Sequence, residues 1–167
     1  MNRARLTRSF KMHLASAPEA VFPLLCPTRE YDWIDTWKCR MVYSASGHAE
    51  LDCIFNTDFP SDGPEDTWVV SRYEPSLLVE FVRVNPLRAI RYTICLREIA
   101  AGETEADWRQ VVTGLNEAGD AFVRGLDEAG FSRRMAELEK MLNHYLATGR
   151  MLRHGRYCER LGGRASW

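Results

Sequence analysis

The residues of this sequence that could do chemistry are single polar side chains set among apolar ones, not a compact motif. Gln110 stands between Trp108 and Val112 with the alternating spacing of a strand, so it shares their face. A buried amide needs hydrogen-bond partners, so we expect Gln110 to bind a polar group of a ligand or the hydroxyl of Tyr92 or Tyr145. The further candidates for acid–base work are Glu80, Tyr92 and His144.

Charged side chains on strand-like runs could act on a ligand only from an inner face. Glu80 is flanked by Val79 and Phe81. Facing inward it would be an acid or base with a raised pKa, but we favour an outward, solvated carboxylate because glutamate is seldom buried. An inward arginine could clamp a ligand carboxylate, whereas cross-strand pairing on the outer face is the favoured role for Arg72, Arg83 and Arg97.

Motifs for catalysis or metal binding are absent from the sequence. Three acids gather around Trp33, but acids in a short helix-and-turn region usually form a solvated face, which is the favoured role for Glu30, Asp32 and Asp35. The four histidines have no metal-binding spacing, so we expect no metal and no cofactor. They are His13, His48, His144 and His154. No GxSxG, P-loop or GxGxxG is present.

The five cysteines do not have the even number and close spacing of a disulfide framework, and no CxxC occurs. They are Cys26, Cys39, Cys53, Cys95 and Cys158. Three of them lie in strand-like runs, where we expect small apolar fillers at Cys39, Cys53 and Cys95. No secretory signal follows the basic start of the chain, and no apolar run approaches the length of a membrane helix. A cytoplasmic location is therefore predicted.

The period of the apolar residues predicts the elements that must position these side chains. A first strand is expected over 9–16, where Phe10, Met12 and Leu14 alternate with polar residues. Two short helices follow, one from residue 17 to Pro27 and one over 28–34. Six further strands are predicted over 37–44, 50–57, 67–74, 77–84, 89–99 and 105–115.

Two helices are expected after the last strand, over 116–126 and 128–148. Asp127 is the expected N-cap of the longer helix and Gly149 the residue after its end. Its apolar stripe has a period near 3.5 and consists of Phe131, Met135, Leu138, Leu142 and Tyr145.

Short turns require antiparallel neighbours, so the predicted fold is α+β, with a curved seven-stranded antiparallel sheet wrapped around the long C-terminal helix. One helix is narrower than seven strands, so we expect a ligand cavity between them. Plain core packing is the alternative role for any single aromatic residue of its wall. The predicted lining is Trp37, Cys39, Met41, Phe55, Tyr92, Ile94, Trp108, Gln110, Phe122, Met135, Leu138, Leu142 and Tyr145.

Several segments between residues 8 and 148 carry a resemblance to a known superfamily. They are FKMHLAS, APEAVFPLL with the following REYDWI, the W-x-C-x-M-x-Y run, and FSRRMAELEKMLNHYLATG. Their order resembles the START-like helix-grip superfamily (SRPBCC), which includes pollen allergens, lipid-transfer domains, polyketide cyclases and heat-shock-protein ATPase activators. REYDWI and LNHYLATG resemble segments of small bacterial members. The superfamily has no universal catalytic signature, so the resemblance implies a pocket but no particular reaction.

Three functions are consistent with this sequence. The first is binding of a small hydrophobic molecule, such as a lipid, by a carrier or sensor. The second is an enzyme of the polyketide cyclase or dehydratase type, which needs an acid–base residue inside the cavity. The third is a protein-interaction module of the heat-shock ATPase activator type, which would act through its surface.

Composition and charge set the remaining limits. The 167 residues are 46% hydrophobic, 27% charged and 11% aromatic with a net charge of −1, as in one ordinary globular domain. The predicted domain, 8–148, is followed by a basic tail, 149–167. Residues 12–148 hold 22 acidic and 13 basic side chains, so both basic ends could dock on this acidic body or on a second copy in a homodimer. An acidic domain is not expected to bind nucleic acid, and no membrane insertion is expected.

Overall fold

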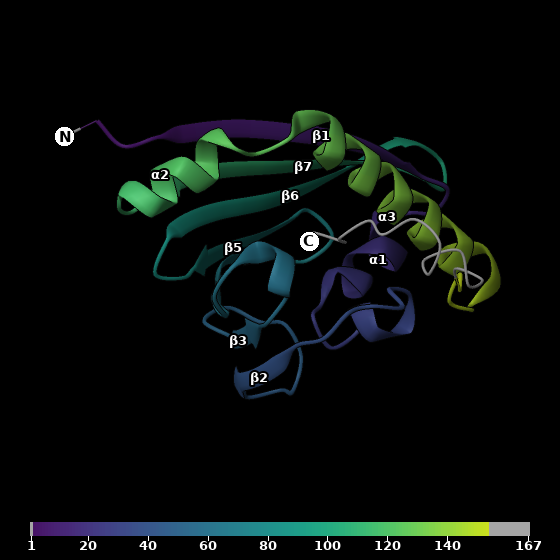
Figure 1. Cartoon of the computed structure of the whole chain (residues 1–167). Coiled ribbons are helices and arrows are strands. Elements are labelled where there is room, and N and C mark those ends of the chain that lie inside the picture. The colour runs from purple at the N-terminus through teal and green to yellow at the C-terminus, as the bar shows by residue number, and fades with distance from the viewer. Residues whose placement is uncertain (1, 154–167) are drawn as a thin grey trace.

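The computed structural model describes residues 2–153 and shows seven strands in one antiparallel sheet that curves around a long helix (Figure 1). The strands are β1 Arg5–Leu14, β2 Arg40–Tyr43, β3 Ile54–Thr57, β4 Asp66–Glu74, β5 Leu78–Val84, β6 Arg88–Ala100 and β7 Glu103–Gly114. Their order is β1-β7-β6-β5-β4-β3-β2, so each strand after β1 pairs with the next along the chain and β1 pairs with β7. The predicted α+β helix-grip architecture is confirmed.

The helices cover one face of this sheet. The α-helices are α1 Pro18–Val21, α2 Glu117–Arg124 and α3 Glu128–Thr148, and the short 3-10 helices are η1 Phe22–Leu25, η2 Glu30–Asp32 and η3 Pro60–Asp62. The Asp127 side chain accepts a hydrogen bond from the Ala129 N–H (3.0 Å), and Gly149 ends α3 in the left-handed conformation (φ 65°). Both predicted ends of the long helix are therefore confirmed.

Several predicted elements have different bounds in the structure. The strands expected over 37–44 and 50–57 are reduced to β2 and β3, and β3 starts late because Asp52 adopts a positive φ of 64° in the turn before it. The helix expected from residue 17 becomes α1 followed by η1, where Pro23 has no N–H to continue α-helical hydrogen bonding. The helix expected over 28–34 is reduced to η2.

The basic N-terminal stretch is part of the domain. The strand expected to begin at Ser9 begins at Arg5, because the whole of β1 finds a partner in β7. Arg3 forms an ion pair with Asp120 in α2 (3.0 Å), and Lys11 forms one with Glu105 in β7 (3.0 Å). This end of the chain therefore docks on the acidic body of the same molecule. Most of the predicted C-terminal tail, residues 154–167, lies outside the described residues.

Hydrogen bonds from α3 satisfy the free edge of β1. The Glu139 carboxylate accepts from the His13 N–H (2.7 Å), while Asn143 accepts from the Ala15 N–H (2.9 Å) and donates to the His13 carbonyl (2.9 Å). An unpaired strand edge is open to association with other chains, and these contacts cover its C-terminal end. They also fix α3 across the curved sheet at one end of its length of about 31 Å.

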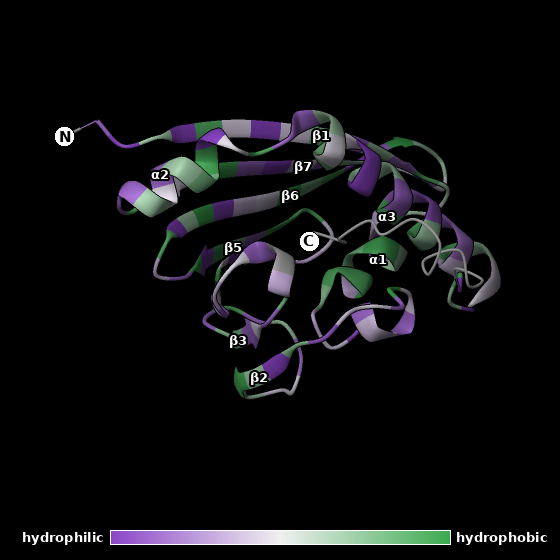
Figure 2. Cartoon of the chain, viewed as in Figure 1, coloured by the Kyte–Doolittle hydropathy of each residue, from purple (hydrophilic) through white to green (hydrophobic). Residues whose placement is uncertain are grey.

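Cross-strand register decides which side chains face α3, because residues opposite one another in an antiparallel pair share a face. One row across the inner face is Leu6, Val112, Ile90, Arg83, Trp68, Phe55 and Met41. A second row is Arg8, Gln110, Tyr92 and Phe81. Figure 2 shows the alternation of apolar and polar residues along these strands. These two rows are thus mostly apolar but carry two arginines, Arg8 and Arg83, and the amide of Gln110.

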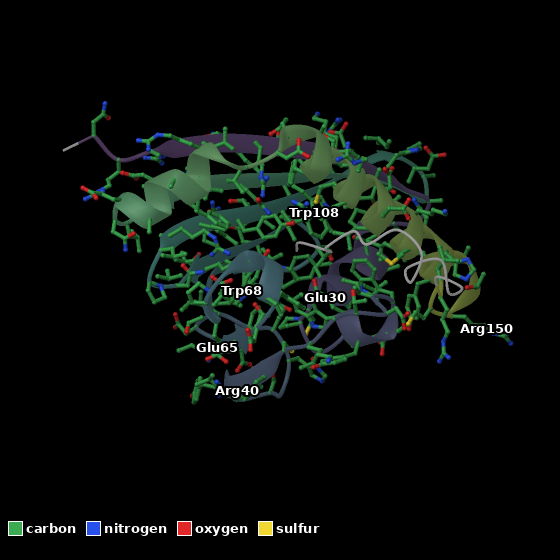
Figure 3. All side chains as sticks on the ribbon, in the orientation of Figure 1. Glu30, Arg40, Glu65, Trp68, Trp108 and Arg150 are labelled. Carbon is green, nitrogen blue, oxygen red and sulfur yellow. The ribbon has the colours of Figure 1, made fainter. Side chains whose placement is uncertain are left out.

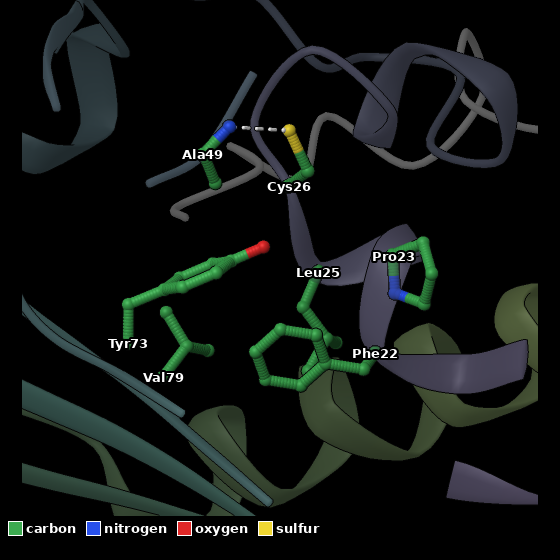
Figure 4. Close-up of a pocket in the computed structure, with 7 residues that line it drawn as sticks. All are labelled: Phe22, Pro23, Leu25, Cys26, Ala49, Tyr73 and Val79. Carbon is green, nitrogen blue, oxygen red and sulfur yellow. Dashed lines mark hydrogen bonds between the residues drawn. The ribbon is translucent and has the colours of Figure 1, made fainter. Parts of the chain in front are cut away.

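The packing is close beneath α1 and η1. Phe22 meets Tyr73 edge-on with ring centroids 5.2 Å apart, and the Ala49 N–H donates to the Cys26 thiol (3.0 Å; Figure 4). The hollow left among these side chains is about 10 Å³, room for about one water molecule. This region is therefore filled core.

Close backbone packing sets the position of α2. A Cβ on Gly119 would lie 1.8 Å from the carbonyl oxygen of Leu87, so only glycine allows α2 to approach the turn between β5 and β6. Asn116 caps the helix by accepting from the Gly119 N–H (2.9 Å) and donates to the Pro86 carbonyl (2.9 Å). These contacts hold α2 against the end of the sheet, with Phe122 turned to the interior.

Candidate ligand cavity

A cavity of about 850 Å³ lies between α3 and the inner face of the sheet. Its volume falls in the range of small-molecule binding sites. The floor comes from β1 and β3 to β7, and the rest of the wall from the segment around η2, from η3, and from α2 and α3. One helix does not fill the concave side of the sheet, which is the reason the cavity exists.

The structure places most of the predicted lining at this cavity. The residues found there are Trp37, Phe55, Tyr92, Ile94, Trp108, Gln110, Phe122, Met135 and Leu138. The structure places four others outside it: Cys39, Met41, Leu142 and Tyr145.

Each of these four side chains has another environment. Cys39 precedes β2, with its backbone N–H bonded to the Tyr31 hydroxyl (2.8 Å), and Met41 accepts from the Cys53 thiol (3.6 Å). Leu142 is fully buried in the core, and Tyr145 lies beside Arg29. The last turns of α3 thus pass over filled core near α1 (Figure 1). The apolar stripe of the helix does not show which of its residues face filled core and which face a cavity.

Contacting aromatic rings form one wall. Phe55 stacks on Trp68 at 5.3 Å between centroids, and Phe81 meets Trp68 edge-on at 5.8 Å. Tyr92 extends this wall, at 6.2 Å from Trp68 and 5.7 Å from Trp108. Rings in such arrangements offer a rigid apolar surface to a ligand.

A polar row crosses the floor beside this wall. Gln110 accepts a hydrogen bond from Nε of Arg8 (2.9 Å) and stands opposite Tyr92 in the neighbouring strand. Gln110 is buried, as is Arg8. Burial raises the pKa of the Tyr92 hydroxyl, which stays protonated at neutral pH. The amide thus has a protein partner, and that partner is an arginine that the sequence analysis did not select.

Glu30 also faces the cavity, which corrects its predicted role as a solvated carboxylate. It lies in η2, on the segment that carries Trp33 and Trp37, and its partly exposed side chain (labelled in Figure 3) borders the cavity that Trp68 and Trp108 also line. Burial among apolar side chains raises its pKa to about 8. No ion pair with Glu30 occurs among residues 2–153, so the carboxyl is protonated at neutral pH.

A buried ion cluster closes another part of the wall. Arg83 donates Nε to Asp66 (2.8 Å) and also binds Asp62, while Arg88 donates Nη1 to Asp66 (2.6 Å) and Nη2 to the Asp62 carbonyl (3.1 Å). All four residues are buried. Arg83 is therefore on the inner face, and the outer-face pairing predicted for it is wrong because β5 turns Val79, Phe81 and Arg83 inward.

Other polar residues lie on the outer face. Glu80 binds the hydroxyls of Ser71 and Thr93 (both 3.0 Å), so the outward orientation is confirmed, although the carboxylate is partly buried. Arg97 pairs across strands with Glu105 on the surface, as expected, whereas Arg72 pairs with Glu74 of its own strand.

Cys95 is exposed, so its predicted role as apolar filler is wrong: β6 turns it outward, in the opposite phase from Ile94.

Within residues 2–153, no three His, Cys, Asp or Glu side chains converge as a metal site. None of the helices in this part of the chain has the length and apolar character to cross a membrane.

Patterns in the sequence indicate two cavity residues that were not predicted, Arg8 and Glu30. Arg8 is in phase with Phe10, Met12 and Leu14, so extending the first strand back by a few residues places it on the inner face. Glu30, Trp33, Ile34 and Trp37 are spaced i, i+3, i+4 and i+7, which places a lone acid on an apolar face. The pairing of Asp62 and Asp66 with two arginines depends on the long loop before β4 and has no comparable signal.

The curved sheet around α3 is a helix-grip fold, and solved structures of low sequence identity share it. Mll3558 from Rhizobium loti has a similar structure, with a TM-score of 0.61 at 14% sequence identity over 86% of this chain and 99% of that protein. Norcoclaurine synthase from Thalictrum flavum, solved as a point mutant with a transition state analogue, matches with a TM-score of 0.66 at 10% identity over 89% and 98%.

A third similar structure is DynU16, a protein of the dynemicin biosynthetic locus. Its TM-score is 0.53 at 16% identity, and the match covers 90% of this chain and 49% of that chain. No protein-family model and no curated protein sequence matches the chain. At these identities the likeness shows the shared fold, and function has to be argued from the cavity.

Proposed function

We propose that the chain binds a small, mainly apolar organic molecule in the cavity, as a carrier or sensor. The observation that carries this proposal is a space of about 850 Å³ with a continuous aromatic wall that the side chains of residues 2–153 leave unfilled. Natural cores are packed to near crystal density, so an unfilled apolar space of this size points to a ligand. Norcoclaurine synthase, which shares the fold, has been solved with dopamine and hydroxybenzaldehyde.

A neutral apolar ligand should stabilise the protein. A compound present at about 100 times its Kd adds about 2.7 kcal/mol, which corresponds to a rise in Tm of roughly 5–10 °C. Thermal unfolding with decanol, farnesol and naphthalene measures this. Leu138→Trp fills the cavity from α3 and should weaken binding at least about tenfold, whereas Lys140→Trp, exposed on the same helix, should not. If none of these compounds raises the Tm, the proposed function is wrong.

A second candidate function is catalysis of the polyketide cyclase or dehydratase type. Glu30 favours it, because a carboxyl with a pKa of about 8 beside an apolar ligand can donate or accept a proton near neutral pH. Tyr92 is near enough that the charge of Glu30 adds to the effect of burial on its pKa. The synthase and the biosynthetic-locus protein among the structural neighbours support such a use of the fold.

Proton exchange on an apolar ketone tests this candidate. Deuterium incorporation next to the carbonyl of β-tetralone, followed by NMR, should be accelerated by the protein and should rise with pH as Glu30 ionises. Glu30→Gln should reduce the acceleration at least about tenfold, because removal of a general base costs about 10²–10⁴ in rate. Equal exchange rates for the two proteins, with β-tetralone bound by both, would rule out Glu30 as the base.

A further inference from the structure

Arg8 is the only buried arginine among residues 2–153 whose acidic partner is missing. It is 9% exposed and borders the cavity. Its Nε atom binds the Gln110 side chain (2.9 Å), and its guanidinium carbon lies 4.2 Å from the centroid of the Phe131 ring. No carboxylate within residues 2–153 forms an ion pair with it, and its buried Nη1 atom has no hydrogen-bond partner.

The other buried arginines are paired with carboxylates. Arg83 and Arg88 also border the cavity, but Asp62 and Asp66 bind them. A charge that is buried without a partner is strongly unfavourable in a protein. The difference between Arg8 and this cluster therefore needs an explanation.

A second unpartnered donor lies beside Arg8. The indole N–H of Trp108 is buried without a hydrogen-bond partner, and Trp108 borders the same cavity. Trp108 is two residues from Gln110 on the same face of β7, and Gln110 is the cross-strand partner of Arg8. Both groups are donors only, so what this end of the cavity lacks is an acceptor.

The electrostatics of this end favour an anion. The pKa of Arg8 is lowered first by burial and then by the positive charge of Arg134 in the first turns of α3. Arg134 borders the cavity as well. Glu30, which forms no ion pair within residues 2–153, is protonated at neutral pH and would not repel an anion.

We propose that the cavity takes an organic carboxylate whose anionic head binds Arg8 at the β1–β7 end and whose apolar body lies along the aromatic wall. With Nε held by Gln110, the two Nη groups remain for the ligand, and the flat guanidinium suits the two oxygens of a carboxylate. The inference rests on the proposed function and specifies its ligand class.

Matched ligand pairs with one apolar skeleton test the head group. Decanoate is compared with decanol, and naphthoate with naphthalenemethanol, by quenching of tryptophan fluorescence near neutral pH. The wild-type protein should bind each carboxylate about tenfold to a hundredfold more tightly than its alcohol, the range expected for hydrogen bonds to a charged group. Equal affinities, or tighter binding of the alcohols, would overturn the carboxylate proposal while the proposed function stands. If neither member of a pair binds, both are wrong.

Three variants assign the preference to Arg8. Arg8→Gln should bind carboxylate and alcohol equally, and Arg8→Lys should keep only part of the preference, since a point charge lacks the paired donors. Gln110→Glu retains the arginine but supplies a neighbouring carboxylate, so it should lose the preference without loss of the guanidinium. This variant keeps the test decisive if removal of Arg8 impairs folding.

Arg97→Gln is the matched control, because Arg97 is an exposed strand arginine on the outer face, paired with Glu105. It should keep the full preference for the carboxylates. A preference that survives in Arg8→Gln and in Gln110→Glu would show that Arg8 does not bind the head group.

Discussion

Asp66→Ala is expected to lower the free energy of unfolding by about 3–5 kcal/mol, the usual result of removing one member of a buried ion pair. Asp66 is 1% exposed and holds both Arg83 and Arg88. Without it, two buried guanidinium groups share Asp62, whose carboxyl already has a pKa raised by burial despite the attraction of Arg83. Urea unfolding followed by circular dichroism measures the loss.

The neighbouring residue supplies the control. Glu65 is exposed and pairs with Arg40 at the surface (3.3 Å; Figure 3), so Glu65→Ala should cost no more than about 1 kcal/mol. A double variant, Asp66→Ala with Arg83→Met, should lose less than the sum of the two single losses, because it removes the charge left unpaired. If Asp66→Ala is no worse than Glu65→Ala, the cluster does not hold the loop at η3 to the sheet.

The sheet and the long helix could be predicted because their patterns are long and local. Ile90, Ile94 and Leu96 keep strict period-two spacing along β6, and the residues that limit α3, Asp127 and Gly149, act within one turn. The segment from residue 37 to 57 alternates as well, but its strands are short, and the left-handed turn at Asp52 delays the start of β3. Alternation sets which face a side chain occupies and does not set where hydrogen-bonded pairing begins.

The polar side chains of the cavity were harder to predict. A charged residue suggests a solvent-exposed position, even where its spacing places it on the apolar face of a strand or helix. Glu30 was expected on a solvated face and Arg8 was not among the candidate residues, although each is in phase with large apolar residues. Arg83 alternates with Val82 and Val84, which made its outer placement plausible. A charged side chain can be buried where residues distant in the sequence bind it, as Gln110 binds Arg8 and Asp66 binds Arg83. No pattern in a single sequence shows that pairing.

The stability of the chain should depend on pH through Glu30. In the unfolded chain its carboxyl loses the proton near pH 4.5, whereas in the fold burial holds the proton until about pH 8. The folded state therefore binds more protons between these values, and stability falls as the pH rises through that window. At about 1.4 kcal/mol per pH unit, with allowance for water in the cavity, the loss is about 2–4 kcal/mol.

Glu30→Gln removes this loss because an amide of the same shape does not ionise. Near pH 5 the variant and the wild type should differ little in unfolding free energy. Near pH 9 the variant should be more stable by about 2–4 kcal/mol, measured by urea unfolding at both pH values. Glu98→Gln, at the exposed end of β6, should show no such divergence.

The comparison between pH values isolates Glu30 from the other titrating groups, since these contribute equally to both proteins. A constant difference between the wild type and Glu30→Gln would mean that the carboxyl is solvated and ionised in the fold. Glu30 would then carry a charge in the cavity near neutral pH, and its use as a neutral neighbour of a bound carboxylate would have to be abandoned. A divergence with rising pH would instead establish a protonated acid beside the aromatic wall at neutral pH, which would not repel an anionic ligand and would become a base as the pH rises toward its pKa.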